Sequence, residues 1–155
     1  MSIFAINVSG GGVPKYAVPE ARVTRLGLVG DSQADLKHHG GPDRAVCLFS
    51  LDVIRRMQAE GHPILPGSAG ENLTIEGLDW STVRPGVRLA IGEGDDRVEL
   101  EIVSYTVPCS NIRASFANAD IRRISQDVHP GQSRLYARVN REGIVRLGHV
   151  CHTIS

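Results

Sequence analysis

Short apolar segments recur along the chain, and glycine or proline bounds most of them. In the clearest case Val98, Leu100 and Ile102 fall on one side of an extended strand while the intervening residues fall on the other. The 17 glycines and 8 prolines lie mainly between such segments, where turns need them. The pattern predicts strands within residues 3–9, 21–31, 44–50, 71–78, 86–94, 97–107, 134–140 and 143–154.

These strands indicate a mainly β protein, an all-β barrel or sandwich, with a hairpin tip at residues 92–96. Two interruptions have helical spacing. Leu51, Ile54 and Met57 predict a helix that stops at Gly61. Two further short helices are expected between residues 110 and 131, the second capped by Asn118 or Asp120. We find no linker or repeat, so residues 1–155 are predicted to form a single β-rich domain with a few short helices.

Composition narrows the class of protein. The chain has 155 residues, and 17 basic and 17 acidic side chains give it a formal net charge of zero. A neutral chain offers no electrostatic case for binding nucleic acid or an anionic membrane. Its start has no basic region of a signal peptide, and no apolar run approaches the roughly 18 residues of a membrane span. With three widely spaced cysteines, we expect reduced thiols and a cytoplasmic location.

Histidines give little support for a metal site made wholly of protein ligands. His38 and His39 are adjacent, so on a strand they point to opposite faces. No pair of residues has the spacing that zinc sites usually show. The roles of these two histidines stay open.

Three glycine-containing loops are candidates for contact with an anion: residues 9–15, 39–44 and 66–72. None has the sequence of a nucleotide-binding loop. Each still offers backbone N–H groups that an anion can approach, and Lys15 or Arg44 lies close by in two of them. For any single loop a plain turn is the favoured interpretation, whereas three such loops in a neutral chain together favour a pocket for an anionic ligand.

The three thiols differ in their surroundings. Cys47 lies in a short apolar run and is expected to be packed in the core, and Cys151 also suits a structural role. Cys109 follows a proline at the end of a strand and precedes a predicted helix with Ser110 as its cap. The positive field at a helix start favours a thiolate, and Arg113 would add to this effect. From these residues alone a functional and a structural role remain open for Cys109.

Several motifs then occur in order. "SGGGVPK", "GDSQADLKHHGGPDRAVCLFS", "PGSAGENLTIEG", "VPCSNI" and "RLYARVN" together resemble the MOSC domain, the module at the C-terminus of molybdenum cofactor sulfurases. The resemblance is closest to the small standalone bacterial MOSC proteins and covers about residues 10–152. It implies a strand-rich, β-barrel-like fold.

The resemblance also implies a ligand, the molybdenum cofactor (molybdenum bound to molybdopterin). Cys109 matches the family cysteine whose thiolate ligates molybdenum, and it is therefore the predicted catalytic and metal-binding residue. The matching motifs imply cofactor contacts from Lys15, Arg44, Asn72, Ser110, Asn111 and Arg134. His39, Gly40, Gly41, Gly70 and Glu71 are expected to shape the loops around the cofactor.

Three functions are open at this point, the first two implied by the resemblance and the third by the candidate anion-binding loops. The first is an oxidoreductase that reduces N-hydroxylated compounds such as hydroxylaminopurine and amidoximes, with electrons from a separate redox partner. The second is a carrier that transfers sulfur or the cofactor through a Cys109 persulfide, loaded by a cysteine desulfurase. It is favoured by the lack of the additional N-terminal β-barrel domain that the larger enzymes carry. The third is a non-catalytic module that binds another anionic ligand.

Overall fold

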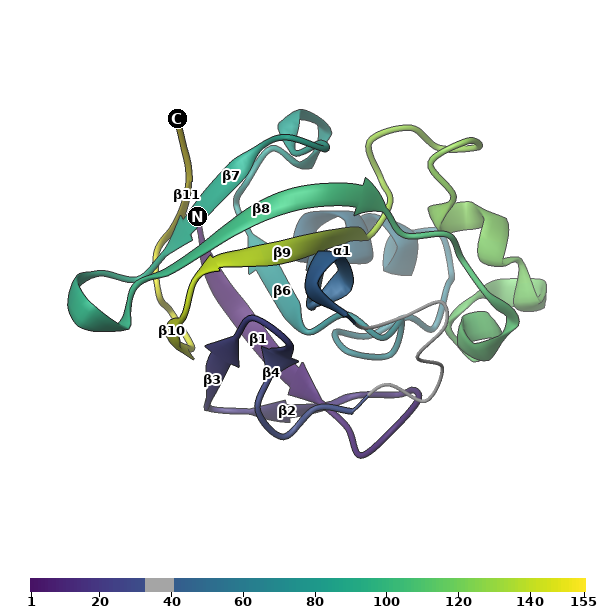
Figure 1. Cartoon of the computed structure of the whole chain (residues 1–155). Coiled ribbons are helices and arrows are strands. Elements are labelled where there is room, and N and C mark those ends of the chain that lie inside the picture. Colours follow the sequence, from purple (N-terminus) through teal and green to yellow (C-terminus); the bar gives the residue numbers. More distant parts are fainter. Residues whose placement is uncertain (33–40) are drawn as a thin grey trace.

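The structure is a computed structural model that describes residues 1–32 and 41–155. Its main element is an eight-stranded sheet with the order β11-β7-β8-β9-β5-β6-β1-β2 (Figure 1). The strands of this sheet are β1 (Ser2–Val8), β2 (Tyr16–Val18), β5 (Val46–Ser50), β6 (Leu73–Glu76), β7 (Arg88–Ile91), β8 (Val98–Tyr105), β9 (Leu135–Arg141) and β11 (Cys151–Ile154).

A second sheet has three strands in the order β10-β3-β4. They are β3 (Glu20–Thr24), β4 (Gly27–Leu28) and β10 (Gly143–Arg146). The predicted strand at 21–31 is thus two short strands, and the one at 143–154 divides into β10 and β11. Strand β2 is the one that the pattern missed, because its residues are mostly exposed and show no apolar alternation.

The mainly β prediction is confirmed, but a closed barrel is not. The edge strands β11 and β2 of the long sheet do not pair with each other in the described part of the chain. The start of β1 does reach the segment before β11, through an isolated bridge between Ser2 and Val150 and a hydrogen bond from Cys151 N to Met1 O of 3.1 Å. The sheet therefore curls without closing. The single-domain organisation stays a prediction.

Strand β8 follows the alternation expected from its sequence. Val98, Leu100 and Ile102 are buried, and the residues between them are partly exposed. The strand pairs antiparallel with β7 on one side and with β9 on the other. The connection between β7 and β8 contains the short 3₁₀ helix η3 (Gly94–Asp96). The predicted hairpin is therefore confirmed.

The helix predicted from residue 51 is confirmed as α1 (Leu51–Ala59), and Gly61 follows it with φ +100°. The side chain of Ser50 caps it by accepting a hydrogen bond from Val53 N at 3.2 Å. One face of the helix is buried against the core, while its charged residues face outward. The helix connects β5 to β6, which run parallel to each other.

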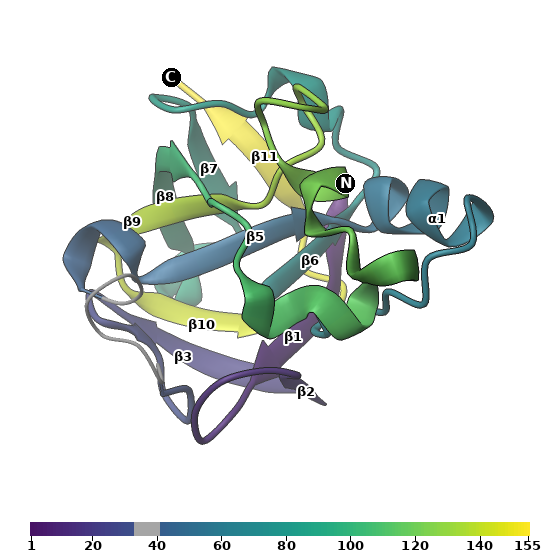
Figure 2. The ribbon, with the colours of Figure 1, turned by 90° about the vertical axis from the view of Figure 1, so that its right-hand side faces the viewer.

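The other helical segments within residues 1–32 and 41–155 are 3₁₀ helices: η1 (Pro42–Arg44), η2 (Trp80–Thr82), η4 (Ser110–Ser115), η5 (Ala117–Ala119) and η6 (Ile121–Ile124). The two short helices expected after residue 110 are thus three 3₁₀ turns, because Asn118 and Ala119 take positive φ values of 57° and 55°. Asp120 caps η6 as predicted, by accepting from Arg122 N. In Figure 1 these turns lie at the right, beyond the end of β8 and the start of β9, and in Figure 2 that side faces the viewer.

Most buried apolar side chains form one cluster, with Phe49, Leu48 and Ile54 fully enclosed. The three cysteines, all within the described residues, are free thiols. No helix in residues 1–32 or 41–155 is long and apolar enough to cross a membrane.

Candidate functional site

The sheet order brings together segments that are distant in sequence. Tyr136 on β9 pairs with Cys47 on β5 and, on its other side, with Ser104 near the end of β8. The chain then leaves β8 and reaches Cys109 four residues after Tyr105. The candidate site therefore forms around Tyr136, at the end of the sheet where β8 ends and β5 and β9 begin.

Cys109 is partly exposed at this end of the sheet. It occupies the position before η4, and its side chain makes no capping hydrogen bond. The prediction that Ser110 caps a helix here is wrong, because the first residue of η4 is Ser110 itself and η4 is a six-residue 3₁₀ helix. So short a helix has few aligned peptide dipoles, which weakens the expected effect on the thiol. The accessibility of Cys109 is the stronger argument for its role.

Tyr136 has four charged or ionisable neighbours. Its pKa is raised, chiefly by burial and next by Cys47, while Arg134 and Arg44 oppose the rise and Cys109 adds to it. The guanidinium carbon of Arg44 also lies 5.6 Å from the centre of the Tyr136 ring, over its face. Arg44, Cys109 and Arg134 therefore share one electrostatic environment.

Cys47 is buried, as the sequence predicts. Burial raises the pKa of its thiol, and Arg134 opposes that rise most strongly. Its sulfur lies 3.9 Å from the hydroxyl of Thr106. Of the two thiols near Tyr136, Cys109 is therefore the one that a ligand can reach.

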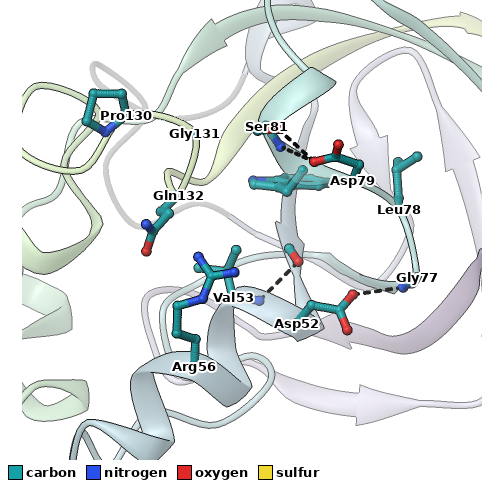
Figure 3. A pocket seen from close by; sticks show the side chains of 12 residues that line it. Asp52, Val53, Arg56, Gly77, Leu78, Asp79, Ser81, Pro130, Gly131 and Gln132 are labelled. Carbon is teal, nitrogen blue, oxygen red and sulfur yellow. Dashed lines mark hydrogen bonds between the residues drawn. The ribbon is translucent and has the colours of Figure 1, made fainter.

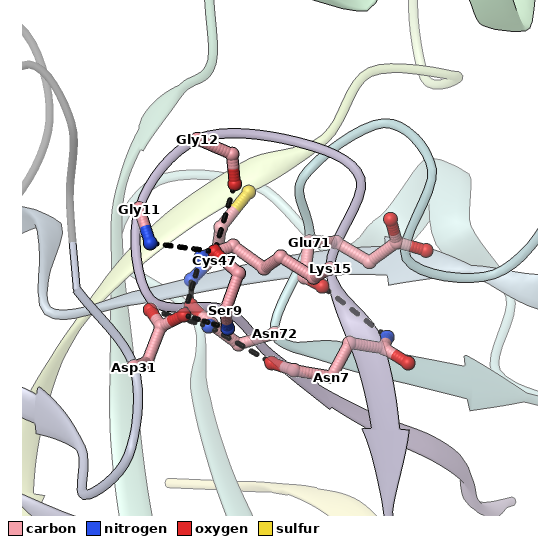
Figure 4. Close-up of polar contacts among 9 residues, drawn as sticks. All are labelled: Asn7, Ser9, Gly11, Gly12, Lys15, Asp31, Cys47, Glu71 and Asn72. Carbon is pink, nitrogen blue, oxygen red and sulfur yellow. Dashed lines mark hydrogen bonds and ion pairs between the residues drawn. The ribbon is translucent and has the colours of Figure 1, made fainter.

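Beneath Cys47, Asp31 joins two of the predicted contact residues (Figure 4). The ammonium of Lys15 lies 2.5 Å from Asp31 Oδ1, and both side chains are about 95% buried. Asn72 donates to Asp31 Oδ2 at 3.0 Å and accepts from Cys47 N at 3.0 Å. Asp31 also accepts from Ser9 N. This network fixes the loop of residues 9–15 against β5.

Arg134 is 3% exposed, yet its hydrogen bonding is incomplete. Its Nη1 donates to Ala69 O at 2.7 Å, while Nε and Nη2 are buried without a partner among the described residues. Nearby Glu71 is fully buried, and burial above all raises the pKa of its carboxyl. Burial disfavours the charged form of this carboxyl, while the Arg134 guanidinium opposes the rise of its pKa. Arg134 is thus a buried cation with unused donors.

The loop of residues 65–70 packs closely against the loop of residues 9–15, and two glycines permit this contact. Gly67 has φ +85°, and a Cβ there would lie 2.6 Å from the carbonyl oxygen of Lys15. Gly70, also at φ +85°, would place a Cβ 2.9 Å from Val13. The two glycine-rich loops therefore contact each other at a distance that no larger residue permits.

The structure brings Arg44, Cys109 and Arg134 together about Tyr136, with Lys15 and Asn72 in the network beside Cys47. Ser110 and Asn111 are exposed at the start of η4. His38, His39 and Gly40 lie outside the described residues. In all these cases a contact with the cofactor stays a prediction. Within residues 1–32 and 41–155 no three His, Cys, Asp or Glu side chains gather as metal ligands.

Sequence reasoning missed two residues of the site. Tyr136 looks like an ordinary strand residue, and only the pairing of β9 with β5 and β8 shows that it lies between Cys47 and the end of β8, from which the chain leads to Cys109. Asp31 lies within a quoted motif, but its central place in the network depends on contacts across more than 15 residues.

Comparison with known proteins agrees with this architecture. A family model described as "MOSC domain" matches residues 35–152. Protein YiiM of Escherichia coli is 33% identical over 112 residues, which cover 70% of this chain and 48% of YiiM. The uncharacterized protein YflK of Bacillus subtilis is 31% identical over 126 residues, covering 80% and 54%. The chain thus spans about half the length of these curated relatives.

Solved structures extend the likeness to the fold. The crystal structure of Escherichia coli YiiM matches with a TM-score of 0.71 and 25% identity, over 100% of this chain and 70% of that one. YUAD of Bacillus subtilis matches with a TM-score of 0.79 at 17% identity, over 98% and 94% of the two chains. By its sequence and its fold, the chain belongs to the MOSC domain family.

Proposed function

We propose that this MOSC protein binds the molybdenum cofactor through Cys109 and reduces N-hydroxylated compounds with electrons from a separate donor. The observation that carries the proposal is the arrangement about Tyr136, where an accessible thiol shares its surroundings with Arg44 and Arg134. The family, which is associated with this cofactor, supports the same ligand. We place the protein in the cytoplasm, where its three free thiols stay reduced.

The residues fit such a ligand on chemical grounds. The unpartnered Nε and Nη2 of Arg134 need acceptors, and the phosphate of a pterin cofactor supplies oxygens that a guanidinium binds well. Thiolate sulfur is a soft ligand, and a single cysteine suffices because the pterin dithiolene holds the metal as well. When bound, the cofactor supplies two-electron chemistry.

Within this assignment each residue has a distinct task. Cys109 would ligate the metal, and Arg134 would bind the anionic part of the ligand. Arg44, which is exposed and lies over the Tyr136 ring, would contact the ligand at the entrance of the site. Lys15 and Asn72 would keep the 9–15 loop in place through Asp31. Reduction of an N-hydroxylated compound consumes two electrons and two protons and releases water. The separate donor provides the electrons, and solvent provides the protons.

Metal analysis tests the ligand role of Cys109. The wild type, purified from a host that makes the cofactor, should contain molybdenum in stoichiometric amount and reduce a hydroxylamine substrate with an artificial electron donor. Cys109→Ala should lose both properties. Cys151→Ala is the matched control, because this buried thiol lies on β11 and should leave the molybdenum content unchanged. Stoichiometric molybdenum in Cys109→Ala would refute the proposed ligand.

A second candidate function is sulfur or cofactor transfer through a persulfide on Cys109. It is supported by the partial exposure of this thiol and by Val107, two residues before it, whose apolar side chain is 79% exposed and could contact a protein partner. Incubation with a cysteine desulfurase and its substrate cysteine should transfer the outer sulfur of the desulfurase persulfide to Cys109 and release the desulfurase thiol, and mass spectrometry detects the added sulfur atom. An unmodified Cys109 would count against transfer.

The third candidate, a non-catalytic module for another anion, rests on the same guanidinium groups without the thiol. In that case Cys109→Ser leaves the affinity for the anion unchanged, whereas Arg44→Ala weakens it. Loss of binding in Cys109→Ser would exclude this function and favour the cofactor.

A further inference from the structure

A separate cleft of about 530 Å³ opens beside α1. Three segments form it: the first turns of α1, the turn at residues 77–81 and residues 130–132, which lead toward β9 (Figure 3). Trp80, only 4% exposed, is one of its walls. Cys109, Arg44, Arg134 and Tyr136 are not among its lining residues. The cleft is therefore distinct from the site around Tyr136.

Opposite charges line the two sides of this cleft. In Figure 3 Arg56 and Gln132 lie on one side, and Asp52 and Asp79 lie on the other. The guanidinium of Arg56 is exposed and has no ion pair or hydrogen bond with any described residue. Gln132 Oε1 is buried and likewise lacks a partner in the described part of the chain.

Both carboxylates are held in place by backbone groups. Asp52 Oδ2 accepts from Gly77 N at 2.8 Å. Asp79 Oδ1 accepts from Ser81 N at 3.2 Å and from Ser81 Oγ at 2.7 Å. Each carboxylate thus uses one oxygen to orient itself. The second oxygen of each accepts no hydrogen bond from the residues that the structure describes, so it is available to a ligand.

We propose that this cleft binds a small zwitterion of the amino-acid class, with its ammonium group toward Asp52 and Asp79 and its carboxylate toward Arg56. A simple anion would be repelled by the two carboxylates, and a simple cation would be repelled by the guanidinium of Arg56. A ligand with both charges matches both sides. The volume falls within the range of small-molecule sites.

Trp80 makes the proposal measurable, since it is the single tryptophan of the chain. The probes are ω-amino acids from 3-aminopropanoate to 6-aminohexanoate, with hexanoate and hexylamine as controls that carry one charge each. At least one ω-amino acid should change the Trp80 fluorescence saturably and bind about tenfold more tightly than either control. Calorimetric titration of the same ligands measures the binding without reliance on fluorescence.

Two arginine variants on one helix separate the site from general effects. Arg56→Gln should weaken the ω-amino acid by about tenfold. Arg55→Gln is the matched control, because Arg55 contacts Glu76 and Phe4 instead and does not line the cleft. Cys109→Ala should bind the ω-amino acid with the affinity of the wild type, because Cys109 does not line the cleft. Binding in the cleft is thereby tested separately from the proposed reductase activity.

Three results would overturn the proposal. One is the absence of saturable binding by both methods up to about 10 mM ligand. Another is equal affinity for hexanoate or hexylamine. The third is an Arg56→Gln variant that binds as the wild type does.

Discussion

At the scale of single residues, burial separates the three cysteines. Cys47 and Cys151 are 6% and 0% exposed, and burial raises the pKa of both thiols, that of Cys151 to about 12. Cys109 is partly exposed. The thiolate is the reactive form of cysteine, so the two buried thiols are protected both by access and by protonation.

We therefore expect alkylation to select Cys109. At about pH 8, iodoacetamide should modify Cys109 in the folded protein well before Cys47 or Cys151, and all three should react in denaturant. Mass spectrometry of proteolytic peptides measures the order. Equal rates for Cys109 and Cys47 in the folded state would contradict the burial described above.

Glu71 gives a prediction about pH. Its pKa is raised above the ordinary value of 4.5, with burial as the main cause. The folded state thus holds this proton more tightly than the unfolded state. The stability that this group contributes is complete below about pH 4.5 and is lost as the pH rises through the raised folded-state pKa.

Glu71→Gln removes this titration. Between about pH 4.5 and the raised folded-state pKa, the wild type loses stability that the variant keeps. The free energy of unfolding of the variant, relative to that of the wild type, should therefore increase by up to about 1.4 kcal/mol for each pH unit. Urea unfolding from about pH 4 to about pH 8 measures the difference. Glu76→Gln, at a partly exposed carboxyl five residues further along the chain, serves as the control. A difference that does not change with pH would contradict the prediction for Glu71.

At the scale of elements, regular periodicity was readable from the sequence and irregular backbone was not. The alternation of β8 and the apolar face of α1 both follow from side-chain spacing. The segment from η4 to η6 shares that helical spacing, but positive φ at Asn118 and Ala119 interrupts it. Apolar residues three or four apart suit 3₁₀ turns as well as an α-helix, so the pattern alone could not distinguish them.

Glycine conformation makes the loop at 65–70 testable. Gly67→Ala and Gly61→Ala both place a side chain at positive φ, which costs about 1 kcal/mol. A Cβ at Gly61 meets no atom within 4 Å, whereas at Gly67 it would lie 2.6 Å from Lys15 O. Urea unfolding should therefore show a clearly larger loss for Gly67→Ala. Equal losses would mean that the loop shifts freely.

The 3₁₀ segment is attached to the end of α1 by an ion pair. Both nitrogens Nε and Nη2 of Arg123 donate to Glu60 at 2.7 Å, and the Arg123 side chain is 7% exposed. Arg123→Gln should cost about 1–2 kcal/mol and speed amide exchange in residues 110–125. The neighbouring Arg122, which pairs with Asp120 at 77% exposure, is the matched control. Arg122→Gln should leave both measurements unchanged.

At the scale of the whole molecule, the site depends on sheet order. The motif residues could be chosen from the sequence, but their meeting point could not, because strands far apart in the chain become neighbours in the sheet. The network around Asp31 depends on the same long-range pairing. The cleft beside α1 also combines three separate segments, and no motif indicated it.

The balance of charge predicts solution behaviour. With 17 basic and 17 acidic side chains, the net charge is close to zero at pH 7. Proteins without net charge repel each other least, so self-association measured by light scattering should be greatest near that pH and fall about two pH units to either side. A monotonic change with pH would contradict this expectation.

The parallel pairing of β5 and β6 has one more consequence. The segments that enter these two strands arrive at the same edge of the sheet, and both border the Tyr136 site. Changes at exposed positions of these segments, such as Asp43 and Leu65, would reshape the entrance, whereas Ile64 and Ala69 are fully buried and hold the loop to the core. Under the proposed function, the range of ligands would diverge among such proteins through these exposed positions, while the buried positions keep the interior packed.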